Sequence, residues 1–143
     1  MNEPAKALPG ASRAVAIGSG LTGKLAAQAL SGCVSDVIVL ERDYLPERPE
    51  PRKGLPQTRH GHHLFYSGGV NAMEIILDKV TDRLLDAGAH RIPLPTGMLA
   101  YFPQGWYRRW PATHFLIACS RDLVDFTVRE LVAAETSIHF STA

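Results

Sequence analysis

The stretch "RAVAIGSGLTGKLAAQALSGCVSDVIVLERD", residues 13–43, decides the fold. Its short apolar run at 14–17 predicts a buried strand, and three small residues at 18–20 end that strand abruptly. Apolar residues then recur at helical spacing over 21–32, where a glycine is a suitable helix stop. A second apolar run at 37–40, made of β-branched residues and leucine, predicts another buried strand. The stretch therefore predicts strand, glycine turn, helix and strand.

Three glycines in this stretch fit the pattern G-x-G-x-x-G. Gly18 permits a tight turn, Gly20 lets the backbone approach a pyrophosphate, and Gly23 lets the helix pack closely on the strand. The helix N-terminus would then direct unpaired N–H groups at the phosphates. Glu41 lies 18 residues beyond Gly23, close to the spacing of the acid that binds a ribose hydroxyl. Glycine also occurs in ordinary strand-to-helix turns, but the surrounding elements favour a dinucleotide site.

The acid favours an unphosphorylated ribose, and hence FAD or NAD rather than NADP. The pattern alone does not separate FAD from NAD. An NAD-dependent dehydrogenase is the weaker interpretation, because its next βαβ unit should follow Glu41 directly. A proline-rich basic loop follows instead.

Composition limits the classes of partner. The chain has 143 residues, a formal net charge of +1 and 45% hydrophobic residues, which is typical of a globular domain with a real core. The near-zero charge argues against nucleic acid, and no apolar run reaches the roughly 20 residues of a membrane helix. Two cysteines and no export signal lead us to expect a cytoplasmic protein with reduced thiols and no membrane association.

The basic stretch "RKGLPQTRHGHHL", residues 52–64, admits a metal site, a nucleic-acid patch, an anion pocket or a plain surface loop. The near-zero net charge of the chain argues against a nucleic-acid patch. His60, His62 and His63 lack a cysteine or acidic third ligand at a useful spacing, so we expect no metal. Because a loop of this length inside a compact domain is usually functional or disordered, the wall of an anion pocket and a surface loop remain.

The rest of the chain predicts further elements. Residues 64–85 read as a helix in two pieces, with Gly88 as a stop. Residues 103–105 read as the turn of a hairpin between aromatic strands, which a plain nucleotide-binding unit lacks. Ser120 is a suitable N-cap for a helix, and the sequence "SIHF" at 137–140 predicts a strand.

Several motifs together resemble the N-terminal part of FAD-dependent monooxygenases of the aromatic-hydroxylase fold. They are "AIGSGLTGKLAA", "VIVLERD", "PRKGLPQTRHGHHL", "TDRLLDAGAHRI" and "ACSRDLVDFTVRE". The chain is most similar to the flavin epoxidases of polyether antibiotic biosynthesis. The resemblance implies an α/β fold: an incomplete Rossmann-like FAD-binding domain plus an aromatic β-hairpin from a substrate domain. The expected segments are 1–92 for the βαβ unit, basic loop and helices, 93–118 for the hairpin, and 119–143 for the return helix and strand.

The resemblance also implies a cofactor and a reaction. In such enzymes FAD is reduced by NAD(P)H as an external reductant and activates oxygen, and one oxygen atom passes to an alkene or aromatic ring. For this chain it implies epoxidation of an alkene in a polyketide intermediate. No residue of the chain is predicted to act as a general acid or base.

The resemblance assigns roles to individual residues. The pyrophosphate would be contacted by Gly18, Gly20 and Gly23. Glu41 would bind the adenosine ribose, Arg42 would lie on the adenine side, and Arg121 would reach the phosphate and ribose. The isoalloxazine and ribityl chain would be flanked by Arg52, Lys53 and Gln57. Aromatic residues would line an apolar substrate pocket: Tyr101, Phe102, Trp106, Tyr107, Trp110 and Phe115. On their residues alone, the aromatic set is equally typical of a core, and Arg121 of an exposed helix start.

The chain also departs from these relatives. They are considerably longer and carry later Asp-Gly and Gly-Asp segments that close the flavin site, which have no counterpart here. In the strand order 3-2-1-4-5 of the nucleotide-binding fold, the strand at 14–17 is strand 1 and lies in the centre. The strand at 37–40 supplies its neighbour on one side, and the neighbour on the other side is missing. Such a strand exposes backbone and apolar groups, so we expect a sticky or partly folded chain that binds FAD poorly and turns over nothing.

Three explanations are open: part of a larger enzyme, half of a split enzyme completed by a partner chain, or a truncated relative with another role. We expect the function of the full enzyme, a flavin-dependent monooxygenase. The alternative is a non-catalytic flavoprotein fragment that acts with a partner chain.

Overall fold

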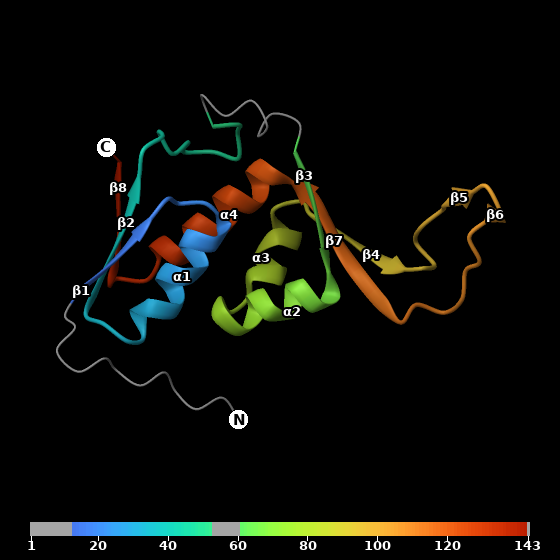
Figure 1. The fold of residues 1–143 in the computed structure, drawn as a ribbon, viewed down its shortest axis with the longest axis horizontal. Coiled ribbons are helices and arrows are strands. Elements are labelled where there is room, and N and C mark those ends of the chain that lie inside the picture. Colours follow the sequence, from blue (N-terminus) through green and yellow to red (C-terminus); the bar gives the residue numbers. More distant parts are fainter. Residues whose placement is uncertain (1–12, 53–60, 143) are drawn as a thin grey trace.

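The computed structural model describes residues 13–52 and 61–142. Two small sheets lie on either side of a group of helices, and a narrow hairpin extends beyond the second sheet (Figure 1). The first sheet has three parallel strands in the order β1-β2-β8. Its elements are β1 (Arg13–Ile17), α1 (Leu21–Ser31), β2 (Asp36–Glu41) and β8 (Ile138–Thr142). The predicted strand, glycine turn, helix and strand are confirmed.

Only one face of the parallel sheet is covered within the described residues. Val37 and Val39 of β2 are completely buried beneath the helices. On the opposite face Val15 is 52% exposed and Ile17 88% exposed. The expectation of a buried first strand is therefore wrong for half of its side chains. The physical reason is that no described element packs on this face of the sheet, which also leaves Leu40 of the central strand β2 43% exposed.

The second sheet is antiparallel, in the order β3-β7-β4. Its strands are β3 (His62–Tyr66), β4 (His90–Leu94) and β7 (His114–Ser120). The expectation of a helix from residue 64 is wrong, because 64–66 belong to β3. Leucine and two aromatics suit a strand that pairs with β7, and the helical period begins only at Ser67.

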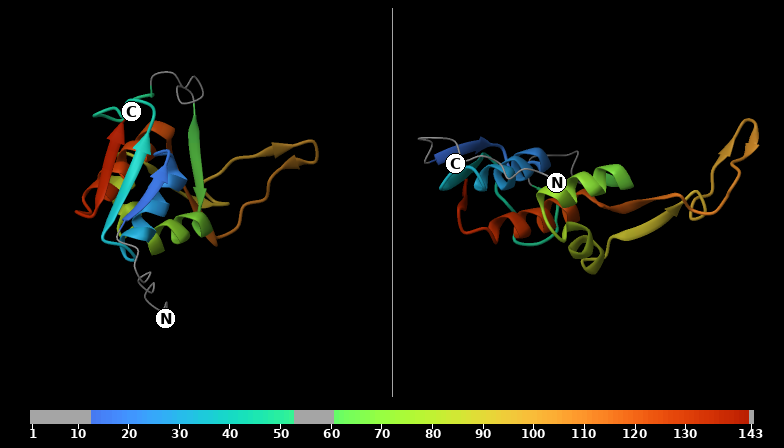
Figure 2. Two further views of the ribbon diagram at one scale, coloured as in Figure 1. Left: turned by 60° about the vertical axis from the view of Figure 1, so that its left-hand side comes forward. Right: turned by 90° about the horizontal axis from the view of Figure 1, so that it is seen from below.

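Three helices besides α1 complete the layer between the sheets (Figure 2). They are α2 (Ser67–Ile76), α3 (Val80–Asp86) and α4 (Arg121–Ala133). Lys79 takes a left-handed conformation with φ of 63°, which separates α2 from α3. Ser120 caps α4 as predicted, because its side chain accepts a hydrogen bond from the Leu123 amide at 3.2 Å.

Helix α4 ties the two sheets together. It contacts α1 and β8 on one side and α3 and β7 on the other. Val124, Val128 and Val132 project from it into one continuous core, and each is at most 1% exposed. Helix α4 therefore belongs to the core of both halves of the fold.

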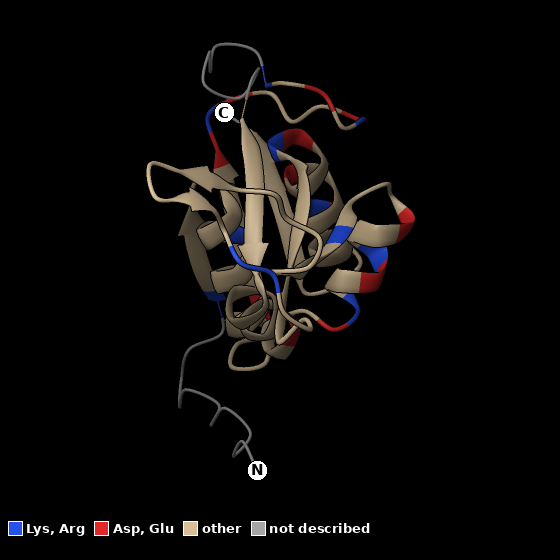
Figure 3. Cartoon of the chain, turned by 90° about the vertical axis from the view of Figure 1, so that its right-hand side faces the viewer, with Lys and Arg blue, Asp and Glu red and all other residues tan. Residues whose placement is uncertain are grey.

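The narrow hairpin consists of β5 (Tyr101–Phe102) and β6 (Gly105–Trp106), which pair antiparallel. It extends away from the body (Figure 1). It carries no acidic residue, whereas α3 and α4 carry charges of both signs (Figure 3). The expected segment boundaries after residues 92 and 118 fall inside β4 and β7, so the second sheet joins residues of all three segments. That division stays a prediction. Among the described helices, none has the length and apolar character to cross a bilayer.

Candidate functional site

The turn between β1 and α1 needs glycine at two positions. Gly18 has φ of +89° and its amide donates to the Leu40 carbonyl at 2.7 Å, which fixes the turn against β2. A Cβ on Gly23 would lie only 1.9 Å from the Gly18 carbonyl oxygen. Gly20 precedes α1, and no side chain caps this helix. The amides of the first turn of α1 thus have no intrahelical acceptor and remain available to an anion.

Glu41 ends β2 beside this turn and is 9% exposed. Its Oε2 accepts from the Ser19 amide at 2.8 Å and from Arg52 Nη1 at 3.0 Å, and its Oε1 accepts from the Asp43 amide at 3.1 Å. Burial raises the pKa of Glu41, but these donors outweigh it and lower that pKa to about 2. A carboxylate offers about four acceptor positions, so roughly one stays free for another donor.

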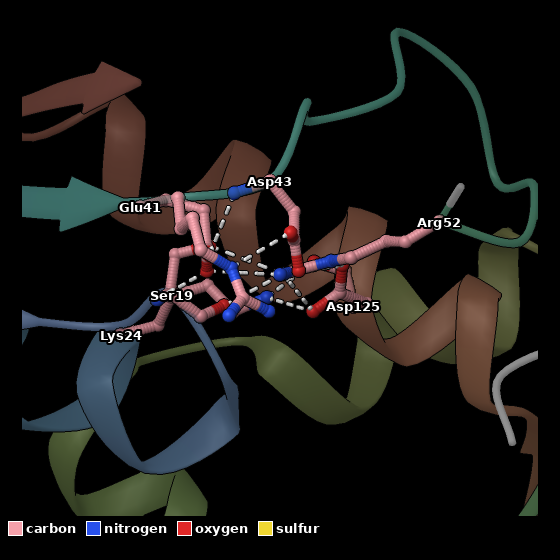
Figure 4. A network of polar contacts seen from close by, with 7 residues as sticks. Ser19, Lys24, Glu41, Asp43, Arg52 and Asp125 are labelled. Carbon is pink, nitrogen blue, oxygen red and sulfur yellow. Dashed lines mark hydrogen bonds and ion pairs between the residues drawn. The ribbon is translucent and has the colours of Figure 1, made fainter. Parts of the chain in front are cut away.

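Arg52 links Glu41 to helix α4 (Figure 4). Its Nε and Nη2 atoms donate to the two carboxylate oxygens of Asp125, each at 2.9 Å. Its Nη2 also donates to the Ser19 carbonyl at 2.8 Å. This two-point contact with a carboxylate is a geometry that only arginine among the basic residues provides.

Lys24 completes the network from α1 and is fully buried. Its Nζ donates to Asp125 Oδ1 at 2.5 Å and to the Asp125 main-chain carbonyl at 2.8 Å. Burial lowers the pKa of Lys24 from 10.5 to about 8, although the Asp125 carboxylate partly opposes that shift. At neutral pH the network consists mainly of two cations and two carboxylates.

The network forms one wall of a cavity of about 290 Å³. The cavity is lined by Gly20, Leu21, Glu41, Asp43, Glu50, Arg52, His63, Arg121, Asp122, Val124 and Asp125. Burial lowers the pKa of His63, as does the nearby Arg121 charge. Burial also raises the pKa of Asp122. The Arg121 side chain is exposed and makes no hydrogen bond or ion pair with another described residue, so its charge is available in this cavity.

The structure brings together four of the residues assigned to the cofactor: Gly20, Glu41, Arg52 and Arg121 all line this cavity. Gly18 and Gly23 shape the turn beside it. Arg42 does not line it; this side chain is 83% exposed and pairs with Asp43 at 3.2 Å. Lys53 and Gln57 lie outside the described residues. The assigned ligand contacts themselves stay predictions.

Sequence reasoning missed Lys24 and Asp125. Each interrupts an otherwise apolar helical period, Lys24 within α1 and Asp125 within α4. A charged residue on the otherwise apolar face of a helix is the sequence feature that could have indicated a buried ion pair. Its partner could not be found from the pattern, because 101 residues separate the two.

A second cavity of about 220 Å³ lies at the other end of β3, beside the hairpin. It is lined by Tyr66, Leu94, Pro95, Met98, Tyr107, Trp110, Thr113 and His114. Of the aromatic residues named from the sequence, only Tyr107 and Trp110 line it; their rings lie 5.7 Å apart. Trp106 is 70% exposed on the hairpin against Tyr101, and Phe115 lies under the Arg91 guanidinium.

Comparison with solved structures places this architecture among known folds. The chain superimposes on 2-methyl-3-hydroxypyridine-5-carboxylic acid oxygenase with a TM-score of 0.64 and 15% identity, over 93% of this chain and 32% of that one. PqsL of Pseudomonas aeruginosa, described as a probable FAD-dependent monooxygenase, gives 0.58 and 17%, over 92% and 32%. The chain shares their fold. It spans about a third of the length of these proteins.

Two other proteins are similar to parts of this chain. p-Nitrophenol 4-monooxygenase PnpA of Pseudomonas putida DLL-E4 gives a TM-score of 0.57 and 16% identity, over 92% of this chain and 31% of that one. By sequence, Protein Rv3254 of Mycobacterium tuberculosis is 49% identical over 55 residues, which is 38% of this chain and 12% of that protein. No protein-family model matches the chain. The expected α/β fold is thus confirmed at the level of architecture.

Proposed function

We propose that the chain forms the adenosine-diphosphate end of the FAD site of a flavin-dependent monooxygenase. The observation that carries the proposal is the placement of Glu41 at the end of β2. It accepts from the amide of the glycine turn at 2.8 Å and faces the uncapped start of α1 across a cavity that Arg121 also lines. A ribose acceptor, a helix N-terminus and a cation meet there, which are the groups that bind an adenosine diphosphate.

The residues present fit this part of the cofactor. The Gly23 position, where a Cβ would collide with backbone, allows the close packing that such a turn requires. The cavity of about 290 Å³ suits part of a dinucleotide rather than all of it. When bound, FAD would supply the redox and oxygen chemistry. Glu41, Arg121 and the turn amides would bind and orient it.

The finer proposal is an alkene epoxidase that acts on a polyketide, with NAD(P)H as reductant. It is supported by the resemblance of the basic stretch and by the aromatic cavity, where Tyr107 and Trp110 present apolar faces. The solved neighbours include an oxygenase and monooxygenases, and their names specify other substrates. The substrate assignment therefore rests on the motifs.

A second candidate is a non-catalytic module that acts with a complementing chain. Within the described residues β1 has an open edge, and Val15 and Ile17 are exposed; both favour this candidate, since a further strand at that edge would extend the sheet. The two candidates differ in whether a yellow flavin copurifies with the assembled protein and is bleached by NAD(P)H.

The binding proposal is tested by titrating FAD and ADP into the full 143-residue chain, with calorimetry as the measurement. We expect weak binding of both ligands, and E41Q and R121Q should each weaken it roughly tenfold because a charge-assisted hydrogen bond is lost. R13Q is the matched control, since Arg13 lies at the far end of β1 and pairs with Asp36. Equal affinities in E41Q, R121Q and the wild type would contradict the proposed site. Tight, stoichiometric FAD binding by the chain alone would contradict the expected incompleteness.

A further inference from the structure

Nearly every donor of Arg52 is already used within the protein. Nε and Nη2 contact both oxygens of Asp125 at 2.9 Å, Nη2 also contacts the Ser19 carbonyl at 2.8 Å, and Nη1 contacts Glu41 at 3.0 Å. The side chain is 8% exposed. A guanidinium has five N–H groups, so about one remains for a ligand. Arg52 is therefore poorly suited to be the main cation for a diphosphate.

The other partner of Arg52 is itself held in place. Asp125 Oδ1 accepts from Lys24 at 2.5 Å, and the Asp125 carbonyl accepts from the same ammonium at 2.8 Å. Lys24 thus fixes both the main chain and the side chain of Asp125. Because Lys24 is completely buried, alternative partners in solvent are not open to it.

The network converges on Ser19, which is fully buried inside the glycine turn. Its amide donates to Glu41 at 2.8 Å, while its carbonyl and its hydroxyl accept from Arg52 at 2.8 and 3.1 Å. Both ends of this residue are therefore fixed by two groups that also contact each other. The chain of contacts leads from Lys24 on α1 to Asp125 on α4, then to Arg52 in the loop after β2, and from Arg52 to Ser19 just before α1.

Charges within the network balance. Lys24 and Arg52 carry two positive charges, and Glu41 and Asp125 carry two negative charges, so little net charge is left for a ligand. Of the two arginines that line the cavity, Arg121 is the one that makes no ion pair with another described residue. The two arginines accordingly have different tasks.

We propose that Arg52 is a positioning residue: held by Asp125 and Lys24, it fixes Ser19 and Glu41 in ligand-binding geometry before a dinucleotide arrives. This inference rests on the proposed dinucleotide site and deepens it. It puts Arg52 at the adenosine end of the ligand, rather than beside the isoalloxazine as the resemblance implied. Such pre-organisation strengthens binding because less ordering remains to be done when the ligand arrives.

The test uses the ligand-free full chain and measures amide hydrogen exchange by mass spectrometry. In D125N, exchange at the amides of residues 18–20 should accelerate about tenfold or more, since the charged anchor of Arg52 is lost. Exchange in β7 and α3 should stay as in the wild type. R52K should behave like D125N, because a single ammonium lacks the planar fork that contacts Asp125, Glu41 and Ser19 together. E130Q is the matched control: it also removes a carboxylate charge from α4, at an exposed side chain that has no ion pair among the described residues and does not line the cavity.

A second variant covers the case in which D125N does not fold. K24M keeps the apolar stem and the contact between Arg52 and Asp125, and it should accelerate exchange of the turn severalfold. If amide exchange at residues 18–20 is unchanged in D125N, the proposal is overturned. If D125N does not fold, unchanged exchange in K24M overturns it. Acceleration spread evenly over the whole chain would overturn it too, since that reports global destabilisation.

ADP affinity, measured on the same variants, separates this inference from the proposed function. D125N should weaken ADP binding about tenfold if the turn is pre-organised by Arg52. If the wild type binds no ADP while exchange follows the expected pattern, the proposed function fails and the positioning role stands. If ADP binds at the site but exchange of the turn does not respond, the positioning role fails and the proposed function stands.

Discussion

At the scale of single residues, Glu41 joins stability to the proposed function. The Asp43 and Ser19 amides and Arg52 all donate to its carboxylate, and the pKa of Glu41 falls to about 2 despite the opposing effect of burial. The same donors keep it ionised and oriented over a wide pH range. A ribose acceptor needs both properties.

The lowered pKa of Glu41 predicts a pH-dependent stability. Its pKa is about 2 in the folded chain against an ordinary 4.5, so the unfolded chain binds more protons between these values. The ionised group therefore contributes stability above about pH 4.5, up to roughly 3 kcal/mol, which is lost as the pH falls toward 2. Urea unfolding of E41Q and wild type at pH 7, 5, 4 and 3 measures it. We expect a difference that shrinks toward acid; a difference independent of pH would refute this account.

At the scale of elements, the contact between α1 and the turn after β1 decides where the helix begins. Gly23 lies on α1 directly against the Gly18 carbonyl. The helix can approach the turn this closely only because position 23 has no side chain. This closeness in turn places the first amides of α1 beside Glu41.

Gly23→Ala should therefore push α1 away from the turn. The new Cβ would lie 1.9 Å from a backbone oxygen, and neither backbone segment can yield without disturbing the core. We expect a loss of more than about 2 kcal/mol in the free energy of unfolding, measured by urea denaturation. Gly20→Ala is the control. A Cβ there meets nothing within 4 Å, so its cost should stay below about 1 kcal/mol. Equal costs for the two variants would contradict the close-contact argument.

At the scale of the whole molecule, the inner face of the parallel sheet packs on helices, whereas its outer face is uncovered within the described residues. The solved neighbours are about three times as long as this chain, and the chain superimposes on a part of each. Val15, Ile17 and Leu40 are between 43% and 88% exposed on that outer face. An edge strand with such side chains favours association with other polypeptides.

We predict that the purified chain self-associates through this face. Val15→Lys should shift the sedimentation velocity distribution toward the monomer, because a charge on an edge strand opposes pairing. The melting temperature should change little, since Val15 is already 52% exposed. Ile75→Lys on α2 is the control, as Ile75 is 72% exposed away from the sheet. Monomerisation by Ile75→Lys alone would point to another surface.

Several features of the fold could be predicted because their causes are close together in the sequence. The glycine turn, α1 and β2 all lie within residues 13–43, and Ser120 caps α4 through a residue only three positions away. The spacing of apolar residues gave the wrong prediction, a helix, at residues 64–66, because leucine and aromatic residues suit either a helix or a strand. Pairing with β7 decides for the strand, and that partner lies some fifty residues further along the chain.

The sequence by itself determined the βαβ unit, the order of its elements and the acid at the end of β2. These features depend only on local steric constraints and on the spacing of apolar residues along the chain. Only the tertiary structure decided what Arg52 contacts. It joins Glu41 and Asp125, which are 11 and 73 residues away, and Lys24 reaches the same carboxylate from 101 residues away. Such partners are chosen by packing, since a buried charge is stable only where the fold brings an opposite charge to it.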